Sequence, residues 1–494
     1  MKYLFLALAL ALFSGCGAFS GGVSNGKARV AASQELPIKS RAFAKIVPLD
    51  GGNFIVAGFS PSIDSILLMR FDDSLHVVWS KGIPENMTEK LKAYYLGNQS
   101  KVATTNGDLP DWSKFYAVNG SLILPINSTK DSVTTYHGLQ VDLKTGGTVR
   151  DIPIATMPFD NHLNPADRGY ILQASMWDNE QFRFRGSPDG NRLLFYNHHV
   201  TVNQASFDAK LFDRSLNSLG NTSWNVQLDT TKETIEGVLP DNSRSILVFI
   251  RNKAEQPSSL RVIRHSMDGG NDELAIHPTF GIDTTIKYAR MRIGMDGRVY
   301  CACSINKSDD VEGAALAIFD FGTHATSLHR QMFQELSKGV LQPVYMTLVD
   351  SVIVLSFERI SEFTDVQRWQ SETIYTTKLA YGNVAIAAFD FDGNPVWSTN
   401  FEKDQEWCPG YTQLASPAHA ISYWFRDQAL MQRRVFSLKN GKTLSDKTDE
   451  EMLRMGGQNN SDPNCSVGLN DGSFLIYTEN GMMSRDSWIY KVVE

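Results

Sequence analysis

Oxygen-bearing side chains stand at alternate positions in the stretch Asp390-Phe391-Asp392-Gly393-Asn394. Hard oxygen ligands with this spacing suit a calcium ion, but an EF-hand loop needs more ligands, including a distal glutamate. Asp-Gly between apolar runs is a strong hairpin signal, because these residues accept the positive φ of tight turns. We therefore interpret the stretch as a hairpin turn and expect no metal there.

The other residues with ligating or nucleophilic chemistry predict no enzyme motif either. His198 and His199 are adjacent in an apparent strand, so they point to opposite faces and cannot share one metal ion in regular geometry. Gly441-Lys442-Thr443 lacks the upstream glycine of a phosphate loop, since Phe436 stands there. The chain contains neither His-Glu-x-x-His nor Gly-x-Ser-x-Gly. The sequence predicts no cofactor, no zincin and no α/β-hydrolase.

The cysteines allow one candidate disulfide. Cys301 and Cys303 lie two apart in a strand-like run, where extended backbone holds them too far apart for an unstrained bridge. Cys408 and Cys465 lie in turn-rich segments near the C-terminal end. An exported compartment would permit a bridge between them. A disulfide and two free buried thiols are both open for this pair.

Four tryptophans lie in longer connections between the repeats described below. The connections are Gly97 to Ser113, Met157 to Gln181, Ile360 to Gly382 and Phe401 to Gly410, and they carry Trp112, Trp177, Trp369 and Trp407. Loops on a rigid scaffold commonly hold binding sites, and tryptophan is enriched at binding hot spots. Either each tryptophan covers its own loop, or the four are candidate binding residues for a protein or a sugar.

A repeated hairpin positions these connections. Val384 to Ser398 predicts a strand ending at Phe389, a turn, and a strand entered through Pro395 and leading to Trp397. Ile66 to Ser80 repeats it, with Phe71, Asp72 and Trp79 at the same mutual spacing. Looser copies centre on Val141-Asp142, Phe212-Asp213, Ile263 to Asp268, Phe319-Asp320 and Phe436. We expect Trp79 and Trp397 to pack between neighbouring units.

A second signal, a turn followed by a short apolar run, occurs eight times. The runs are Phe54 to Ala57, Leu122 to Ile126, Leu193 to Tyr196, Ile246 to Ile250, Val299 to Cys303, Val352 to Leu355, Ile421 to Phe425 and Phe474 to Tyr477. Runs without strict alternation are typical of strands covered on both faces. Two hairpins per unit give an all-β fold, a β-propeller of eight blades with four antiparallel strands each, or alternatively seven blades.

The two ends of the chain are expected to complete one blade. Trp488 to Val493 is interpreted as the third strand of the last unit, which then lacks a fourth. Ala28 to Ser33 is placed to supply that strand and so to close the ring without a long exposed edge.

Composition excludes other classes. The formal charge of −7 and the pI near 5.9 argue against a general nucleic-acid binder, which would show a basic face. Aromatic residues make up 11% of the chain and heptads rich in Lys and Glu are missing, which argues against a coiled coil.

The N-terminus predicts export. Residues 1–15 combine a basic start with a short apolar segment, as in a secretory signal peptide. The run Phe13-Ser14-Gly15-Cys16 resembles the lipobox of bacterial lipoproteins, which implies cleavage before Cys16 and acylation of this cysteine. The alternative is an ordinary cleavable signal with an incidental cysteine. Residues 16–36 are expected to form a flexible tether and residues 37–494 a single propeller domain.

The resemblance also implies a location. In that family an Asp after the acylated cysteine directs retention at the inner membrane, and Gly17 stands at this position here. We expect the outer membrane, with the body on the periplasmic face rather than at the cell surface, since no acidic run follows Cys16.

Some repeats resemble those of known families. Asp50 to Gly58 and Leu67 to Asp72 look like the repeats of bacterial propeller lipoproteins. Val141 to Gly146 is similar to quinoprotein-like repeats, although the tryptophan that follows in those repeats is absent here. The architecture is similar to the eight-bladed lipoprotein of the outer-membrane protein assembly machinery. The resemblance implies a scaffold and no catalytic residues.

Two functions follow from this pattern. The first is a non-catalytic, monomeric lipoprotein that touches the membrane only through its anchor and binds an envelope protein or glycan. Its rival is a carbohydrate hydrolase or lyase with a site at the channel mouth. An enzyme should gather several titratable side chains with perturbed pKa values in one pocket, whereas a scaffold should expose an apolar or aromatic patch.

Overall fold

The computed structural model describes residues 29–37, 44–60, 65–82, 116–118, 120–130, 133–158, 183–252, 259–278, 284–307, 310–333, 340–349, 352–369, 372–401, 411–416, 419–426, 430–448, 459–461, 467–469, 473–480 and 487–493. These residues form β-strands joined by turns, together with one short 3₁₀ turn, η1 (Asp50–Gly52). The prediction of an all-β fold is therefore confirmed.

The described strands are grouped in eight antiparallel sheets. The first four sheets along the chain contain β2 (Ala44–Pro48), β3 (Phe54–Ser60), β4 (Ser65–Phe71) and β5 (Val77–Gly82); β6 (Tyr116–Val118), β7 (Ser121–Lys130), β8 (Val133–Asp142) and β9 (Thr148–Pro158); β10 (Arg183–Gly186), β11 (Arg192–Val200), β12 (Gln204–Asp213) and β13 (Ser218–Gln227); β14 (Glu233–Pro240), β15 (Ser245–Asn252), β16 (Leu260–Ser266) and β17 (Asn271–Ile276).

The next three sheets have the same order of four strands. They contain β18 (Thr284–Ile293), β19 (Val299–Lys307), β20 (Asp310–Asp320) and β21 (Ala325–Met332); β22 (Val340–Val349), β23 (Val352–Trp369), β24 (Glu372–Phe389) and β25 (Pro395–Phe401); β26 (Tyr411–Ser416), β27 (His419–Arg426), β28 (Leu430–Ser437) and β29 (Thr443–Thr448).

The last sheet joins both ends of the described chain. It contains β30 (Asn459–Ser461), β31 (Val467–Gly468), β32 (Phe474–Asn480), β33 (Ser487–Val493) and β1 (Arg29–Leu36), with β1 outermost. Arg29 pairs with Val493 and Leu36 with Ser487, so β1 is antiparallel to β33. The N-terminal strand thus closes the ring as predicted, and residues 29–36 of the segment assigned as a tether belong to this strand.

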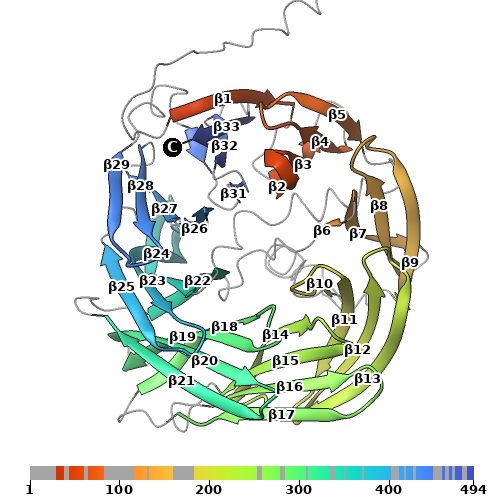
Figure 1. The fold of residues 1–494 in the computed structure, drawn as a ribbon, viewed down its shortest axis with the longest axis vertical. Coiled ribbons are helices and arrows are strands. Elements are labelled where there is room, and N and C mark those ends of the chain that lie inside the picture. The colour runs from red at the N-terminus through yellow and green to blue at the C-terminus, as the bar shows by residue number, and fades with distance from the viewer. Residues whose placement is uncertain are drawn as a thin grey trace, which may run out of the picture.

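Figure 1 shows the sheets arranged in a ring, with the first strand of each sheet nearest the centre and the fourth at the rim. Each of the eight predicted apolar runs falls within the second strand of its sheet, namely β3, β7, β11, β15, β19, β23, β27 and β32. Such a strand has a neighbouring sheet on each side, which explains its continuous apolar sequence. The fold is a β-propeller.

The hydrophobic core lies between neighbouring sheets. One cluster of buried residues combines Phe249 of β15 with Val299 and Cys303 of β19, and another combines Tyr300 of β19 with Leu355 of β23. Alternate side chains of β19 therefore enter different interfaces. Cys301 and Cys303 are both buried free thiols, as expected from their spacing in one strand.

Trp79 and Trp397 join neighbouring sheets, as predicted. Trp79 of β5 donates a hydrogen bond of 2.7 Å from Nε1 to the carbonyl oxygen of Leu143 in the next sheet, and Trp397 of β25 bonds Leu438 in the same way. The indole rings lie against the turn glycines Gly146 and Gly441, both with positive φ. A Cβ at either position would collide with the indole ring, so the tryptophan can pack there only because the residue is glycine.

Basic side chains make the same kind of connection at other interfaces. Lys491 Nζ donates to the carbonyl oxygen of Asp73 at 2.8 Å, Arg150 to Ser215 at 2.6 Å, Arg251 to Ile286 at 3.2 Å and Arg298 to Phe391 at 3.1 Å. Each acceptor belongs to an adjacent sheet. Hydrogen bonds from charged donors to backbone carbonyls therefore supplement apolar packing around the ring.

Candidate binding face

The antiparallel strands give the ring two chemically different faces. The turns between first and second strands and between third and fourth strands lie at one end of each sheet, which we call the turn face; examples are Asp189–Asn191 and Asp390–Asn394. The connections between second and third strands, and from one sheet to the next, lie at the other end, the loop face; an example is Thr201–Asn203.

Aspartates organise the turn face. Asp390 Oδ1 accepts hydrogen bonds from the amides of Asp392 and Asn394, at 3.0 and 2.8 Å, and Oδ2 accepts one from the Asn394 side chain. Partial burial raises the pKa of the Asp390 carboxyl, but these hydrogen bonds outweigh it and the net pKa is lowered. The predicted hairpin is confirmed, because the carboxylate that a calcium site would use is bonded to its own turn.

The same turn recurs around the ring. Asp72 and Asp213 each accept hydrogen bonds from the amides two and four residues later. Their pKa values are likewise lowered, because hydrogen bonds from their turns outweigh the effect of burial. Each carboxylate thus stabilises a separate hairpin.

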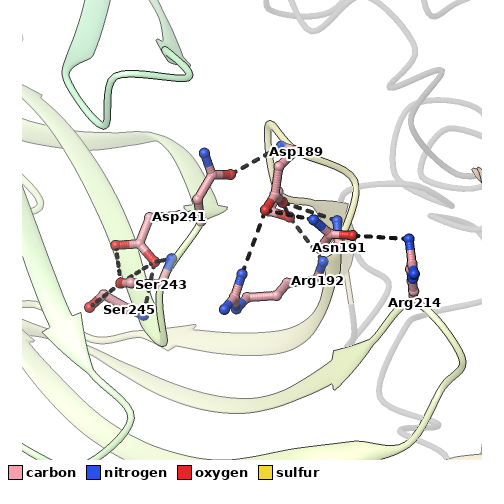
Figure 2. A network of polar contacts seen from close by, with 9 residues as sticks. Asp189, Asn191, Arg192, Arg214, Asp241, Ser243 and Ser245 are labelled. Carbon is pink, nitrogen blue, oxygen red and sulfur yellow. Dashed lines mark hydrogen bonds and ion pairs between the residues drawn. The ribbon is translucent and has the colours of Figure 1, made fainter.

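One polar network links two neighbouring sheets on the turn face (Figure 2). The Asn242 side chain accepts a hydrogen bond of 3.0 Å from the Asp189 amide, and Asp189 Oδ2 lies 3.7 Å from Arg192 Nη1. Asp241, beside Asn242, accepts hydrogen bonds from the amides of Ser243 and Ser245. The network fixes two turns against each other, which is a structural role.

Three of the predicted insertions begin and end at the loop face. The segments 83–115, 159–182 and 402–410 each join the fourth strand of one sheet to the first strand of the next, so the strand ends that flank them lie on this face. Trp112, Trp177 and Trp407 belong to these segments and lie outside the described residues, as do Cys16, Cys408 and Cys465.

The fourth insertion, Ile360 to Gly382, differs from the expected loop. Its residues continue β23 and β24, which pair regularly from Ile360 with Tyr381 to Trp369 with Glu372. The sequence interpretation was wrong here because these strands extend beyond the packed sheet and so lack the continuous apolar run that marks the other strands. Trp369 is the last residue of β23, at the far end of the hairpin on the loop face.

Charged residues that the sequence analysis missed lie at the loop-face end of two sheets. Arg251 Nε is 2.6 Å from Glu236 Oε1, and both side chains are largely buried. Glu236 occupies the β-bulge of the innermost strand β14, between Ile235 and Gly237. Bulges redirect side chains and are frequent near functional sites. Arg251 also bonds Ile286 of the next sheet, so this pair connects β14 and β18, the first strands of two neighbouring sheets.

A second ion pair lies on the same sheet. Arg261 Nε is 3.0 Å from Glu233 Oε1, and its Nη1 is 3.4 Å from Glu273 Oε2. Arg261 Nη2 donates to the carbonyl oxygen of Gln227 in the preceding sheet. Each of these charged groups has an oppositely charged partner, and the cluster links two neighbouring sheets.

The buried Glu358 was also not predicted. It lies on β23 at the root of the long hairpin, is fully buried, and pairs with Gln342 on one side and Val384 on the other. A buried carboxylate is costly unless it has polar partners. No sequence motif marks Glu358. The pairing of β23 with β22 and β24 in the folded sheet brings it to this buried position.

The described residues include no metal-binding group, and their exposed large hydrophobic side chains are spread over several sheets. In this part of the chain, no group of three or more His, Cys, Asp or Glu side chains is arranged to hold a metal ion. The exposed large hydrophobic residues belong to several sheets: Val77, Val78, Val149, Val200, Val202, Met295, Met332 and Val396. Among the described residues there is also no helix with the length and hydropathy needed to cross a membrane.

Comparison with known proteins finds solved structures with some likeness in fold but identifies no protein family. No protein-family model matches the chain, and no curated protein sequence does. Polysaccharide lyase Uly1 is 11% identical with a TM-score of 0.40, over 84% of this chain and 95% of the lyase. A variant of the Synechocystis apocarotenoid oxygenase is 9% identical with a TM-score of 0.37, over 86% of this chain and 94% of the oxygenase.

An uncharacterised protein from Listeria monocytogenes EGD-e is 10% identical with a TM-score of 0.30, over 68% of this chain and 82% of that protein. At these identities and TM-scores the likenesses carry no information about activity.

Proposed function

We propose that this chain is a lipid-anchored protein of the bacterial outer membrane whose propeller is a binding scaffold for an envelope protein or glycan. The observation that carries the proposal is the separation of the two faces. The connections that carry Trp112, Trp177 and Trp407 begin and end at the loop face, where the β23–β24 hairpin also lies, whereas the turn face consists of short turns, several of them organised by aspartates. Variable connections on one side of a rigid ring are a common basis of binding.

The direction of β1 supports an orientation relative to the membrane. Arg29, at the start of β1, pairs with Val493, which ends a strand running toward the turn face. Residues preceding Arg29 therefore leave the ring from the turn face. If Cys16 is acylated, the turn face is directed toward the membrane and the loop face away from it.

The tether also limits how far the body can move. Twelve residues, 17–28, separate the anchor from β1. A flexible chain of this length has an end-to-end distance of about 20 Å. We place the body on the periplasmic side of the outer membrane, with its loop face open to a partner.

Affinity capture from gently solubilised envelopes tests the proposal. The bait is the acylated protein, compared with a variant in which Trp112, Trp177, Trp369 and Trp407 are replaced by alanine. Loss of even one hot-spot tryptophan costs about 2 kcal/mol, or roughly thirtyfold in affinity. We expect a partner that wild type retains to be lost from the variant.

A matched control carries four alanine substitutions at the exposed residues Val77, Val149, Met295 and Val396, all away from the loop face. This control should retain the partner. Equal retention by all three proteins would refute the role of the tryptophans. Recovery of no protein or glycan with any bait would refute the scaffold function.

A further inference from the structure

The β23–β24 hairpin extends well beyond its sheet. β22 pairs with β23 only as far as Ile360, and β25 pairs with β24 only from Val384 onward. Among the described strands, Ser361–Trp369 and Glu372–Ala380 therefore pair only with each other. At 3.3 Å per residue, this two-stranded ribbon is about 30 Å long.

The root of the ribbon is fixed. A β-bulge lies between Glu358 and Ile360, where the register of β23 against β24 shifts. The Arg359 guanidinium lies over Gly382, since a Cβ built on this glycine would be 2.5 Å from Arg359 Nε. Glu358 is fully buried and Val384 almost so. The ribbon is thus anchored at a tightly packed root. This anchoring reduces the conformational entropy that the ribbon would lose on binding a partner strand.

The β23 edge of the ribbon is long and lacks the proline and lysine residues that often prevent pairing at an unpaired edge. It does carry three charged residues, Glu362, Asp365 and Arg368, which also discourage pairing. At the rim of the ring, β9 contains Pro153 and Pro158, and β25 begins with Pro395. Ser361–Trp369 contains neither proline nor lysine. Its outward N–H and C=O groups are complementary to another extended strand.

The neighbouring segment of this chain is too short to cover that edge. Residues 334–339 precede β22 and join Phe333, after the outermost strand β21, to Val340 of the innermost strand β22. Six residues span at most about 20 Å. A segment of this length alone cannot cover a 30 Å edge.

We propose that the β23 edge, Ser361–Trp369, is a strand-addition site for an extended segment of a partner protein. This inference rests on the proposed scaffold function and specifies the kind of partner. The pairing of β23 with β24 continues without a register shift from Ile360 to Trp369, so a bound strand can pair along this whole edge. Cross-strand pairs favour aromatic and β-branched residues, so the bound segment should carry them at alternate positions and contain no proline.

A peptide with the sequence of Glu372–Tyr381 provides a defined probe, because this sequence already pairs with β23 in the protein. The test measures amide hydrogen exchange in the full-length acylated protein with and without the peptide. Amides of Ser361–Trp369 that point outward should exchange rapidly in the free protein. At ten times the Kd of the peptide, their exchange should slow about tenfold.

The same peptide with N-methyl groups at alternate residues is the matched control, since it keeps the side chains but cannot complete the hydrogen-bond ladder. It should give no protection. Protection of the whole edge before peptide is added, or equal protection by the methylated peptide, would overturn the proposal. Failure of the parent peptide to slow exchange would overturn it too, while retention of a partner in the capture experiment would leave the scaffold function standing.

Discussion

At the scale of single residues, one device recurs in several hairpins of the turn face. An aspartate at the end of the third strand accepts hydrogen bonds from amides of the turn, and a residue with positive φ follows three or four positions after it. Gly393 occupies the positive-φ position in one turn, but Leu75, Leu216 and His324 occupy it in others. The aspartate hydrogen bonds therefore compensate for the strain of a non-glycine residue there.

Gly441→Ala should destabilise the protein strongly. Gly441 has a φ of +66°, and an added Cβ would collide with the Trp397 ring. Positive φ and overpacking together should cost about 2–4 kcal/mol in the free energy of unfolding. Gly190→Ala is the control, because Gly190 has nearly the same φ of +67° with nothing within 4 Å of its Cβ position. It should cost only about 1 kcal/mol, and equal urea midpoints for the two variants would contradict the packing argument.

Asp390→Ala should give a pH-dependent loss of stability. The folded-state pKa of Asp390 is lowered, so its ionised form stabilises the fold above its ordinary pKa of 3.8 and this contribution is lost as pH falls through the folded-state value. We expect a loss of about 1 kcal/mol at pH 6 that shrinks as the pH falls below 3.8 and through the lowered folded-state pKa.

Asp392→Ala is the control in the same turn. The Asp392 side chain is 84% exposed and lies 3.8 Å from Arg298, so its loss should change stability by less than about 0.5 kcal/mol. Denaturation at several pH values measures both effects. A difference between wild type and Asp390→Ala that stays constant with pH would show that the charge of Asp390 is irrelevant.

Residue types in the repeats could be predicted, but their partners could not. The spacing of Trp79 and Trp397 identified them as contacts between units, and the structure confirms it. Their acceptors, the carbonyls of Leu143 and Leu438, have no sequence signature because every residue carries a carbonyl. For the same reason, the connections made by Arg251 and Lys491 were not predicted.

At the scale of secondary-structure elements, ring closure depends on a strand with a single well-buried anchor. Leu36 of β1 is 2% exposed and packs in a cluster with Phe54 and Ile489, whereas Ser33 is exposed. Leu36→Ala should therefore lower the free energy of unfolding by about 2–4 kcal/mol. Ser33→Ala should change it little. Amide exchange in β33 should accelerate in the first variant only, and an unchanged rate there would argue against closure by β1.

Removal of the ribbon should separate binding from folding. Replacing residues 361–380 by Asn-Gly joins Ile360 to Tyr381, which already face each other in the ladder. Because the deleted residues lie beyond the four-stranded part of the sheet, the melting temperature should fall by no more than a few degrees. Captured partner should be lost. A shortened protein that unfolds would show that the ribbon belongs to the core, and one that binds normally would exclude the ribbon as a site.

The success of sequence interpretation differed among elements for a physical reason. Second strands such as β3 and β19 are covered by sheets on both sides, so burial imposes apolar runs that are easy to recognise. The extended part of β23 pairs only with β24 among the described strands. Its mixture of polar, charged and aromatic residues resembled a loop, although regular pairing continues to Trp369.

At the scale of the whole molecule, the topology places different elements at the two faces. The N-terminal strand starts at the turn face, while the ribbon and the strand ends that flank the insertions lie at the loop face. Val202 and Met295 provide a matched pair for testing this difference. Both are exposed hydrophobic residues, 67% and 71% exposed, and they lie in turns on the loop face and the turn face respectively.

Photo-crosslinking in intact envelopes, with a photoreactive amino acid at Val202 in one variant and at Met295 in another, tests the central claim most directly. The account predicts a protein or glycan adduct from position 202 that disappears when the four candidate tryptophans are replaced by alanine, and no such adduct from position 295. An adduct formed only from position 295, or equally from both positions, would contradict the assignment of the loop face as the binding surface.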